Sequence, residues 1–433
     1  MGSAVEIEAV PAEIATPAVS KADGLWRGAV RPVLFWTHLV AGLLSATVVF
    51  IMSVTGVALT YQKQMTAWAD VRGLDGTPPI ANAFRLPADS LIARVRRDSG
   101  VSPTSVIWRA GDRQPVELVL PEGRRVFMNA YTGETLGGGS ASMRKFFRVM
   151  TDWHRWLAMS GEQRTTGRAI TGISNLAFLV LVLSGIWLWW PRNLSRVAFR
   201  NVMSFRRGLS SKARDFNWHN VIGIWSFVPL VFVVASGVVI SYPWASDLVY
   251  RVAGENPPPR GGAAASGARA GAAMSGAQAG RGGGSDAGRA AVEGPRAAVD
   301  VALSNAVATA AQRMPDWRSI SLTLPRSDTA SFAFTIDRGM GGEPHKRAQL
   351  ALGPDGAETR WQAFGDQSSA RQWRSILRFA HTGEVLGFAG QTIAGLVSLG
   401  ATLLVYTGIA LSWRRWRSWR KRRSDASFSA GPA

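Results

Sequence analysis

The chain has 433 residues, of which 47% are hydrophobic, and its formal net charge at pH 7 is +20. This composition is too apolar for a typical secreted enzyme and too polar for a bundle of membrane helices alone, so it indicates a membrane protein with sizeable soluble parts. The sequence contains no cysteine, which excludes disulfides, thiolate metal sites, iron–sulfur clusters and haem attached through a C-x-x-C-H motif. Any redox group must therefore be held non-covalently.

Four apolar segments are long enough to cross a bilayer, which requires about 20 residues. They cover approximately residues 33–61, 170–190, 218–242 and 390–413. The first run is too long for a signal-peptide core, so we expect an uncleaved anchor. Many tryptophans lie near the ends of these segments, which is typical of an interfacial belt.

Basic residues cluster at 192–214 and 414–423, and each cluster lies beside an apolar segment. Under the positive-inside rule such clusters mark cytoplasmic flanks, and we favour this interpretation over a nucleic-acid patch. Both chain termini are then cytoplasmic. The two large segments between the spans are then expected on the outer side of the membrane.

Each outer segment has the pattern of a small α+β module. In the first we expect a helix at 87–97, strands at 106–109, 116–120 and 125–129, and a turn at Glu122 and Gly123. In the second we expect a helix at 301–313 and strands at 319–324, 331–336 and 347–352. The tract at 254–295, rich in Gly, Ala, Arg and Ser, cannot bury a core and is expected to be a flexible insertion.

The expected organisation in chain order is as follows. It comprises a disordered cytoplasmic tail (1–32), a first span (33–61), a first outer module (62–140), an outer helix with the second span (141–190), a basic cytoplasmic loop (191–215), a third span (216–242), a second outer module with its insertion (243–365), an outer helix with the fourth span (366–413) and a basic cytoplasmic tail (414–433).

The chain contains an internal repeat. Residues 35–61 (FWTHLVAG…GVALTY) and 216–242 (FNWHNVIG…GVVISY) match in register, each with a histidine at the start of the apolar run and a glycine four residues later. Residues 167–190 and 390–413 also match at one constant offset, and another histidine lies upstream of each. The chain is therefore two copies of span, outer module, histidine and span.

Four of the five histidines occupy these repeat-related positions: His38, His219, His154 and His381. Ionisable residues are rare in membrane helices, so their recurrence indicates an intramembrane ligand site. The topology puts one pair, His38 and His219, near the cytoplasmic ends of spans, and the other pair near the outer ends. Two facing imidazoles suit a six-coordinate haem iron used in electron transfer. A glycine one turn after the histidine would let a flat macrocycle approach the helix backbone.

Other interpretations remain open. A histidine at a helix end is usually an interfacial hydrogen-bonding residue, and the glycines can be simple packing contacts. No Asp or Glu lies within the predicted spans to complete a zinc or iron site or to carry protons. Asp152 and Glu384 flank histidines but are expected at the outer surface, and His345 is expected to be exposed.

These features resemble the PepSY-associated transmembrane helix family, whose members include siderophore-iron reductases of the ferrioxamine B reductase type. The resemblance rests on H-x-x-x-G in two spans, on MNAYTGETLG at 128–137 and on HTGEVLG at 381–387. It covers the chain apart from the N-terminal tail, the insertion and the basic C-terminus. It implies two non-covalent b-type haems in a four-helix membrane domain, with His38, His154, His219 and His381 as axial ligands, and two periplasmic PepSY modules.

The resemblance also implies a function. We expect a mainly α membrane protein that passes electrons to a periplasmic acceptor, most simply the iron of a ferric siderophore, from a separate cytoplasmic protein or quinol. Electrons would enter at His38/His219 and leave from His154/His381, with the two irons on the order of 20 Å apart across a core of about 30 Å. Five arginines are candidates to bind haem propionates or an anionic ferric chelate, or to anchor lipid headgroups: Arg155, Arg164, Arg168, Arg374 and Arg378.

Two alternatives belong to other classes. The chain could be a membrane protein whose PepSY modules bind or inhibit peptides or proteases, without redox activity. It could also be a diheme quinol oxidase that reduces a small oxidant.

Overall fold

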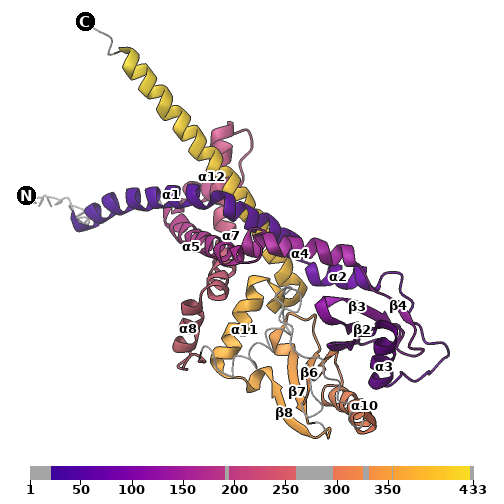
Figure 1. Cartoon of the computed structure of the whole chain (residues 1–433). Coiled ribbons are helices and arrows are strands. Elements are labelled where there is room, and N and C mark those ends of the chain that lie inside the picture. Colours follow the sequence, from indigo (N-terminus) through magenta and orange to yellow (C-terminus); the bar gives the residue numbers. More distant parts are fainter. Residues whose placement is uncertain (1–20, 191–194, 260–295, 325–330, 354, 430–433) are drawn as a thin grey trace, which may run out of the picture.

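The computed structural model describes the chain apart from residues 1–20, 191–194, 260–295, 325–330, 354 and 430–433. Four long helices form a bundle, and a single β-sheet lies at one end of it (Figure 1). The bundle helices are α1 (Lys21–Leu59), α5 (Gln163–Trp189), α7 (Ser211–Ser241) and α12 (Gly387–Ser429).

All four bundle helices are long and apolar enough to cross a membrane, over Val30–Leu59, Gln163–Trp189, Ser211–Ser241 and Glu384–Arg423. The prediction of four spans is therefore confirmed. Helix α1 packs against α5 and α12, and α7 packs against the same two, so α1 and α7 lie diagonally across the bundle. Its centre is filled by aliphatic side chains, among them Val182, Leu230, Val234, Val397 and Ala401.

The helices extend beyond the apolar runs. Helix α1 begins at Lys21, so the second part of the expected N-terminal tail is helical. Helix α12 continues to Ser429, so most of the expected basic tail is helical too. Helix α7 begins at Ser211 and brings Asp215 into the third candidate span, contrary to the expectation of spans free of acidic residues. The apolar pattern could not show these ends because they are polar helix that leaves the hydrocarbon region.

The sheet has eight antiparallel strands in the order β4-β3-β2-β1-β5-β6-β7-β8. The first outer segment supplies β1 (Ser105–Arg109), β2 (Val116–Val119), β3 (Arg125–Met128) and β4 (Thr135–Gly137). The second supplies β5 (Ser319–Thr323), β6 (Phe332–Asp337), β7 (Arg347–Leu352) and β8 (Glu358–Ala363). Because β1 pairs with β5, with Ile107 opposite Ser321, the two segments build one continuous sheet. The two segments, which were expected as two modules, thus share one sheet.

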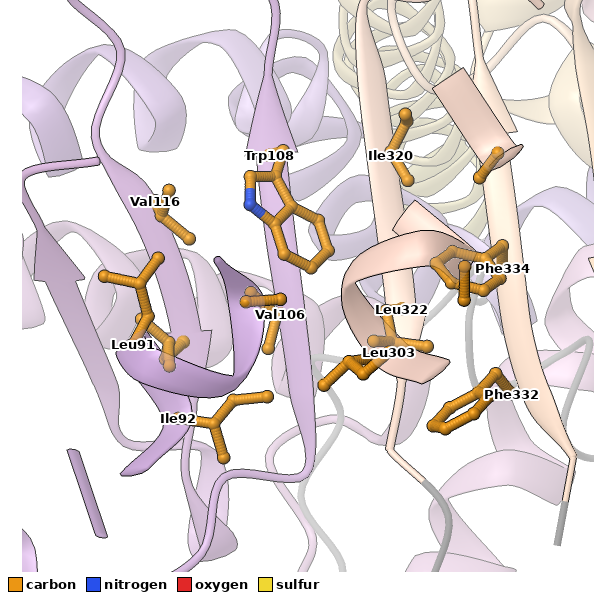
Figure 2. Packing of buried hydrophobic residues seen from close by; sticks show 14 of the residues in the cluster. Leu91, Ile92, Val106, Trp108, Val116, Leu303, Ile320, Leu322, Phe332 and Phe334 are labelled. Carbon is orange, nitrogen blue, oxygen red and sulfur yellow. The ribbon is translucent and has the colours of Figure 1, made fainter. Parts of the chain in front are cut away.

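One face of the sheet is covered by α3 (Ala88–Ser99) and α10 (Arg296–Arg313). Their apolar sides pack on the alternating inward residues of the strands, as Leu91, Val106, Leu303, Leu322 and Phe334 show in Figure 2. The period-2 pattern of these strands is what made most of them predictable. Strands β4 and β8 were missed. The expected insertion at 254–295 lies almost entirely outside the described residues.

Shorter helices connect the sheet to the bundle. They are α2 (Gln62–Val71), α4 (Ala141–Trp156), α8 (Pro243–Val252) and α11 (Ser369–His381), with α6 (Arg196–Met203) in the basic loop at the other end. Helix α4 packs on α1 and α5, and α11 packs on α7, so these two helices hold His154 and His381 against the bundle. Helix α4 ends where Leu157 and Ala158 take positive φ, which turns the chain into α5.

Candidate cofactor site

The four repeat-related histidines form two facing pairs. The ring centroids of His38 on α1 and His219 on α7 are 6.4 Å apart, and those of His154 on α4 and His381 on α11 are 6.2 Å apart. A metal–imidazole bond of about 2 Å on each side places the centres of two axial imidazoles about 6 Å apart. Both pairs are therefore spaced to hold one metal ion between them. The fifth histidine, His345, is exposed, as expected.

The pairs lie in two layers. His38 is near the start of the first candidate span, whereas His154 bonds to Thr55, which follows His38 by seventeen residues on the same helix. A helical rise of 1.5 Å per residue puts these layers about 25 Å apart. We call His154 and His381 the sheet-proximal pair, because their helices lead to the sheet, and His38 and His219 the sheet-distal pair.

Each of the four paired histidines has a hydrogen-bond partner at its Nδ1 atom. Nδ1 lies 2.9 Å from Ser184 Oγ in His38 and 2.9 Å from Thr407 Oγ1 in His219. It lies 3.0 Å from Thr55 Oγ1 in His154 and 2.8 Å from the Val233 carbonyl oxygen in His381. Partners of this kind orient metal-binding imidazoles and leave the other ring nitrogen to the metal.

A glycine lies against each ring as well. A Cβ atom added at Gly185 would be 3.6 Å from His38 Cε1, and one at Gly408 would be 3.7 Å from His219 Cε1. The corresponding distances are 3.6 Å from Gly56 to His154 and 3.2 Å from Gly237 to His381. By contrast, the two glycines one turn after His38 and His219 (Gly42 and Gly223) face Leu181 and Leu404. These two are helix-packing contacts, which is the alternative interpretation of their role.

The sheet-proximal pair is electrostatically suited to ligation. Burial, and then the charges of His381 and Arg155, lower the pKa of His154 to about 4. Burial also lowers the pKa of His381, and the nearby charges of Arg155 and Arg378 act in the same direction. Both imidazoles are therefore neutral at pH 7, which is the form that binds metal.

A model of the PepSY-associated TM region family matches residues 35–415 of this chain. The chain belongs to this family. A search among curated proteins finds no match.

In this family member the five candidate arginines are placed as follows. The charges of Arg155 and Arg378 both disfavour protonation of His381. Arg374 is close enough to Arg378 for their charges to repel. Arg164 stacks on Trp156 at 4.1 Å and pairs with Asp152 at 3.3 Å, and Arg168 donates to the Ser241 carbonyl at 3.1 Å. The sheet-proximal pair thus lies beside an excess of positive charge.

Two acidic residues lie near the histidine pairs. Glu384, three residues after His381, has a side chain that is 13% exposed and pairs with Lys63 at 2.7 Å. Asp215 is almost fully buried one turn before His219, and it pairs with Arg214 at 3.0 Å and with Arg414 at 2.9 Å. Within the described residues no group of three His, Cys, Asp or Glu side chains could hold a metal ion.

The hydroxyl partners of the histidines were not predicted. A signal for them exists, because every span carries a Ser or Thr followed by Gly and then Ile or Val: Thr55-Gly56, Ser184-Gly185, Ser236-Gly237 and Thr407-Gly408. Between the two repeats the residue before the glycine differs, Thr55 against Ser236 and Ser184 against Thr407, so the repeat is not identical at this position.

Proposed function

We propose that this membrane protein holds two b-type haems, one between each histidine pair, and transfers electrons across the bilayer to an acceptor on the sheet side. The observation that carries the proposal is the facing of two histidine pairs at 6.2 and 6.4 Å. Each pair offers two ligands only. This fits a group that brings its own four equatorial nitrogens and needs two axial imidazoles.

When bound, each haem would supply reversible one-electron chemistry. The chain holds the histidines in place from opposite sides of the bundle. Between the layers it provides an apolar interior, in which Leu230, Val234 and Ala401 are buried. The residues of this cluster are all apolar, so none of them would carry protons along with the electrons.

The distribution of basic residues supports an orientation in the membrane. The basic segments at Arg196–Met203 and in the last turns of α12 lie at the end of the bundle remote from the sheet. Under the positive-inside rule that end would lie in the cytoplasm and the sheet in the periplasm of a bacterial inner membrane. The electron donor would be a separate cytoplasmic protein or a quinol.

The acceptor we favour is the iron of a ferric siderophore. The arginines beside the sheet-proximal pair supply positive charge for haem propionates or for an anionic ferric chelate, because guanidinium groups pair with carboxylates in bidentate fashion. In a peptide-binding membrane protein without redox activity these histidines would only pack, and their spacing in two facing pairs supports the haem proposal instead.

The acceptor can be tested by oxidising the chemically reduced protein with a ferric siderophore in a stopped-flow instrument. The gallium chelate of the same siderophore is the matched control, since it has the same charge and shape and accepts no electron. We expect reoxidation by the ferric chelate only. Reoxidation by a small oxidant such as superoxide, with no effect of the ferric chelate, would favour the quinol oxidase instead.

A further inference from the structure

We propose that the Ser/Thr–Gly pairs of α1, α5 and α12 are positioning devices, each of which fixes the rotation and the tautomer of one histidine. This inference rests on the proposed function. The four hydroxyl–glycine pairs are Thr55-Gly56, Ser184-Gly185, Ser236-Gly237 and Thr407-Gly408. They lie beside His154, His38, His381 and His219 respectively, and only at His381 is a backbone carbonyl, that of Val233, the closer partner.

Each histidine is held in position by residues of a helix other than its own. The hydroxyl–glycine pair of α5 holds the histidine of α1, and that of α12 holds the histidine of α7. The pair of α1 holds the histidine of α4, and the Val233 carbonyl of α7 holds the histidine of α11. Each of these histidines is therefore fixed only when two helices are packed together. The positions of the imidazole rings thus depend on the packing of the bundle.

The direction of the hydrogen bonds can be derived. Ser184 Oγ donates to the Val180 carbonyl at 2.6 Å, and Thr407 Oγ1 donates to the Leu403 carbonyl at 2.8 Å. A hydroxyl has one proton, so each oxygen can only accept from the imidazole. The Nδ1 atoms of His38 and His219 must then carry the proton, which leaves the Nε2 lone pair for a metal.

The same argument holds for the sheet-proximal pair, with one difference. Thr55 Oγ1 donates to the Ile51 carbonyl at 2.6 Å, so it accepts from His154. His381 Nδ1 lies closest to the Val233 carbonyl, at 2.8 Å, whereas Ser236 Oγ is 3.4 Å away. A carbonyl only accepts, so His381 has the same tautomer without help from Ser236.

The glycine also positions the histidine, because the missing side chain lets the edge of the imidazole ring lie against the backbone of the neighbouring helix. At Gly185 the nearest atom to an added Cβ is His38 Cε1, and at Gly408 it is His219 Cε1. A branched side chain at these positions would push the ring away from its hydroxyl partner. The glycine and the hydroxyl therefore act on the same ring, one by steric fit and the other by a hydrogen bond.

Other hydroxyls in the spans provide the comparison. Thr402 Oγ1 donates to the Ser398 carbonyl at 3.0 Å, and Ser45 Oγ donates to the Ala41 carbonyl at 2.7 Å. This bond to the preceding turn is common for Ser and Thr in helices. What distinguishes Thr55, Ser184 and Thr407 is the second hydrogen bond, to a histidine.

The test compares Thr407→Val with Thr402→Val on the same helix. Haem affinity and the reduction potential of each haem are measured in detergent. We expect Thr407→Val to weaken one haem about 10- to 100-fold, the usual effect of losing such a partner, and to shift its potential, whereas Thr402→Val leaves both unchanged. Thr407→Ser should restore the wild-type values. Equal haem affinities and equal reduction potentials in the two valine variants would overturn the proposal.

A second measurement separates this inference from the proposed function. Nitrogen-15 spectra of histidine-labelled protein prepared without haem report the tautomer directly. The Nδ1–H form is expected for His219 in the wild type, and a mixture of both tautomers in Thr407→Val. If the wild type binds no haem, the proposed function fails, but the tautomer difference between wild type and Thr407→Val still tests the positioning role of Thr407. A mixture of both His219 tautomers in the wild type would overturn that role.

Discussion

The imidazoles of His154 and His381 face each other with ring centroids 6.2 Å apart, although they come from two connecting helices in different halves of the chain. Their helices pack on opposite sides of the bundle, α4 on α1 and α11 on α7. The pair therefore exists only through tertiary structure. The same is true of His38 and His219, which approach from diagonal helices of the bundle.

The pairing can be tested with histidine variants. His154→Ala or His381→Ala should abolish one haem and leave the other, because the sheet-distal pair is untouched. The double variant His38→Ala/His154→Ala should lose both haems, whereas His345→Ala, at an exposed position, should lose none. Full retention of one haem in the double variant would contradict the pairing by layer.

The glycines should differ in their tolerance of a methyl group. An added Cβ at Gly237 would be 3.2 Å from His381 Cε1 and 3.0 Å from Asn175 Nδ2, whereas at Gly185 the nearest atom is at an ordinary 3.6 Å. We expect Gly237→Ala to lower haem content at the sheet-proximal pair at least several-fold and Gly185→Ala to be close to wild type. Haem per chain, measured spectroscopically, checks this. A larger loss of haem in Gly185→Ala than in Gly237→Ala would contradict the steric argument.

A buried ion network should stabilise the junction of sheet and bundle. The Asp70 carboxylate is 3% exposed, pairs with Arg144 and with Arg125 at 3.4 Å, and accepts from the Ser140 backbone at 2.8 Å. Removing one partner of a buried ion pair costs about 3 kcal/mol or more, so Asp70→Asn should lower the unfolding free energy by that order.

The control for this variant is Asp112→Asn. The Asp112 side chain is 88% exposed and lies 3.9 Å from Arg85. Exposed pairs contribute about 1 kcal/mol at most, so the control should unfold nearly like the wild type in denaturant. Equal destabilisation by both substitutions would show that Asp70 is not a junction contact.

The haem-free protein should lose stability in mild acid because of His154. Its pKa is about 4 when folded against an ordinary value of 6.5. As the pH falls between these values, the unfolded chain binds a proton that the folded chain does not. The unfolding free energy then falls by about 1.4 kcal/mol per pH unit from this group, with no further loss below about pH 4. The variant His154→Gln lacks this contribution, so the difference between the two unfolding profiles is the measurement. Parallel profiles would mean that His154 is not neutralised by burial.

The sequence predicted the spans and the residues of the two pairs. Long apolar runs identify membrane helices by themselves, and the recurrence of a histidine in repeat-related positions singled out His38, His219, His154 and His381. Depth along the spans was enough to expect which histidines meet. The helices and strands with clear periodicity, such as α3, β1 and β7, were also predictable.

Other features depend on non-local contacts that a sequence pattern does not carry. The pairing of Ile107 with Ser321, which joins the two outer segments into one sheet, requires a register between distant strands. Asp215 was missed because its charge ended the apolar run, although it is buried between Arg214 and Arg414. The role of Thr407 was missed because a hydroxyl in a membrane helix usually bonds only its own preceding turn.

The measurement that tests the account most directly is a reduced-minus-oxidised absorption spectrum of the detergent-purified protein, with haem quantified per chain. We predict close to two b-type haems per chain, both six-coordinate and low-spin. A colourless protein from cells with adequate haem supply would contradict the account, and the peptide-binding alternative would then take its place.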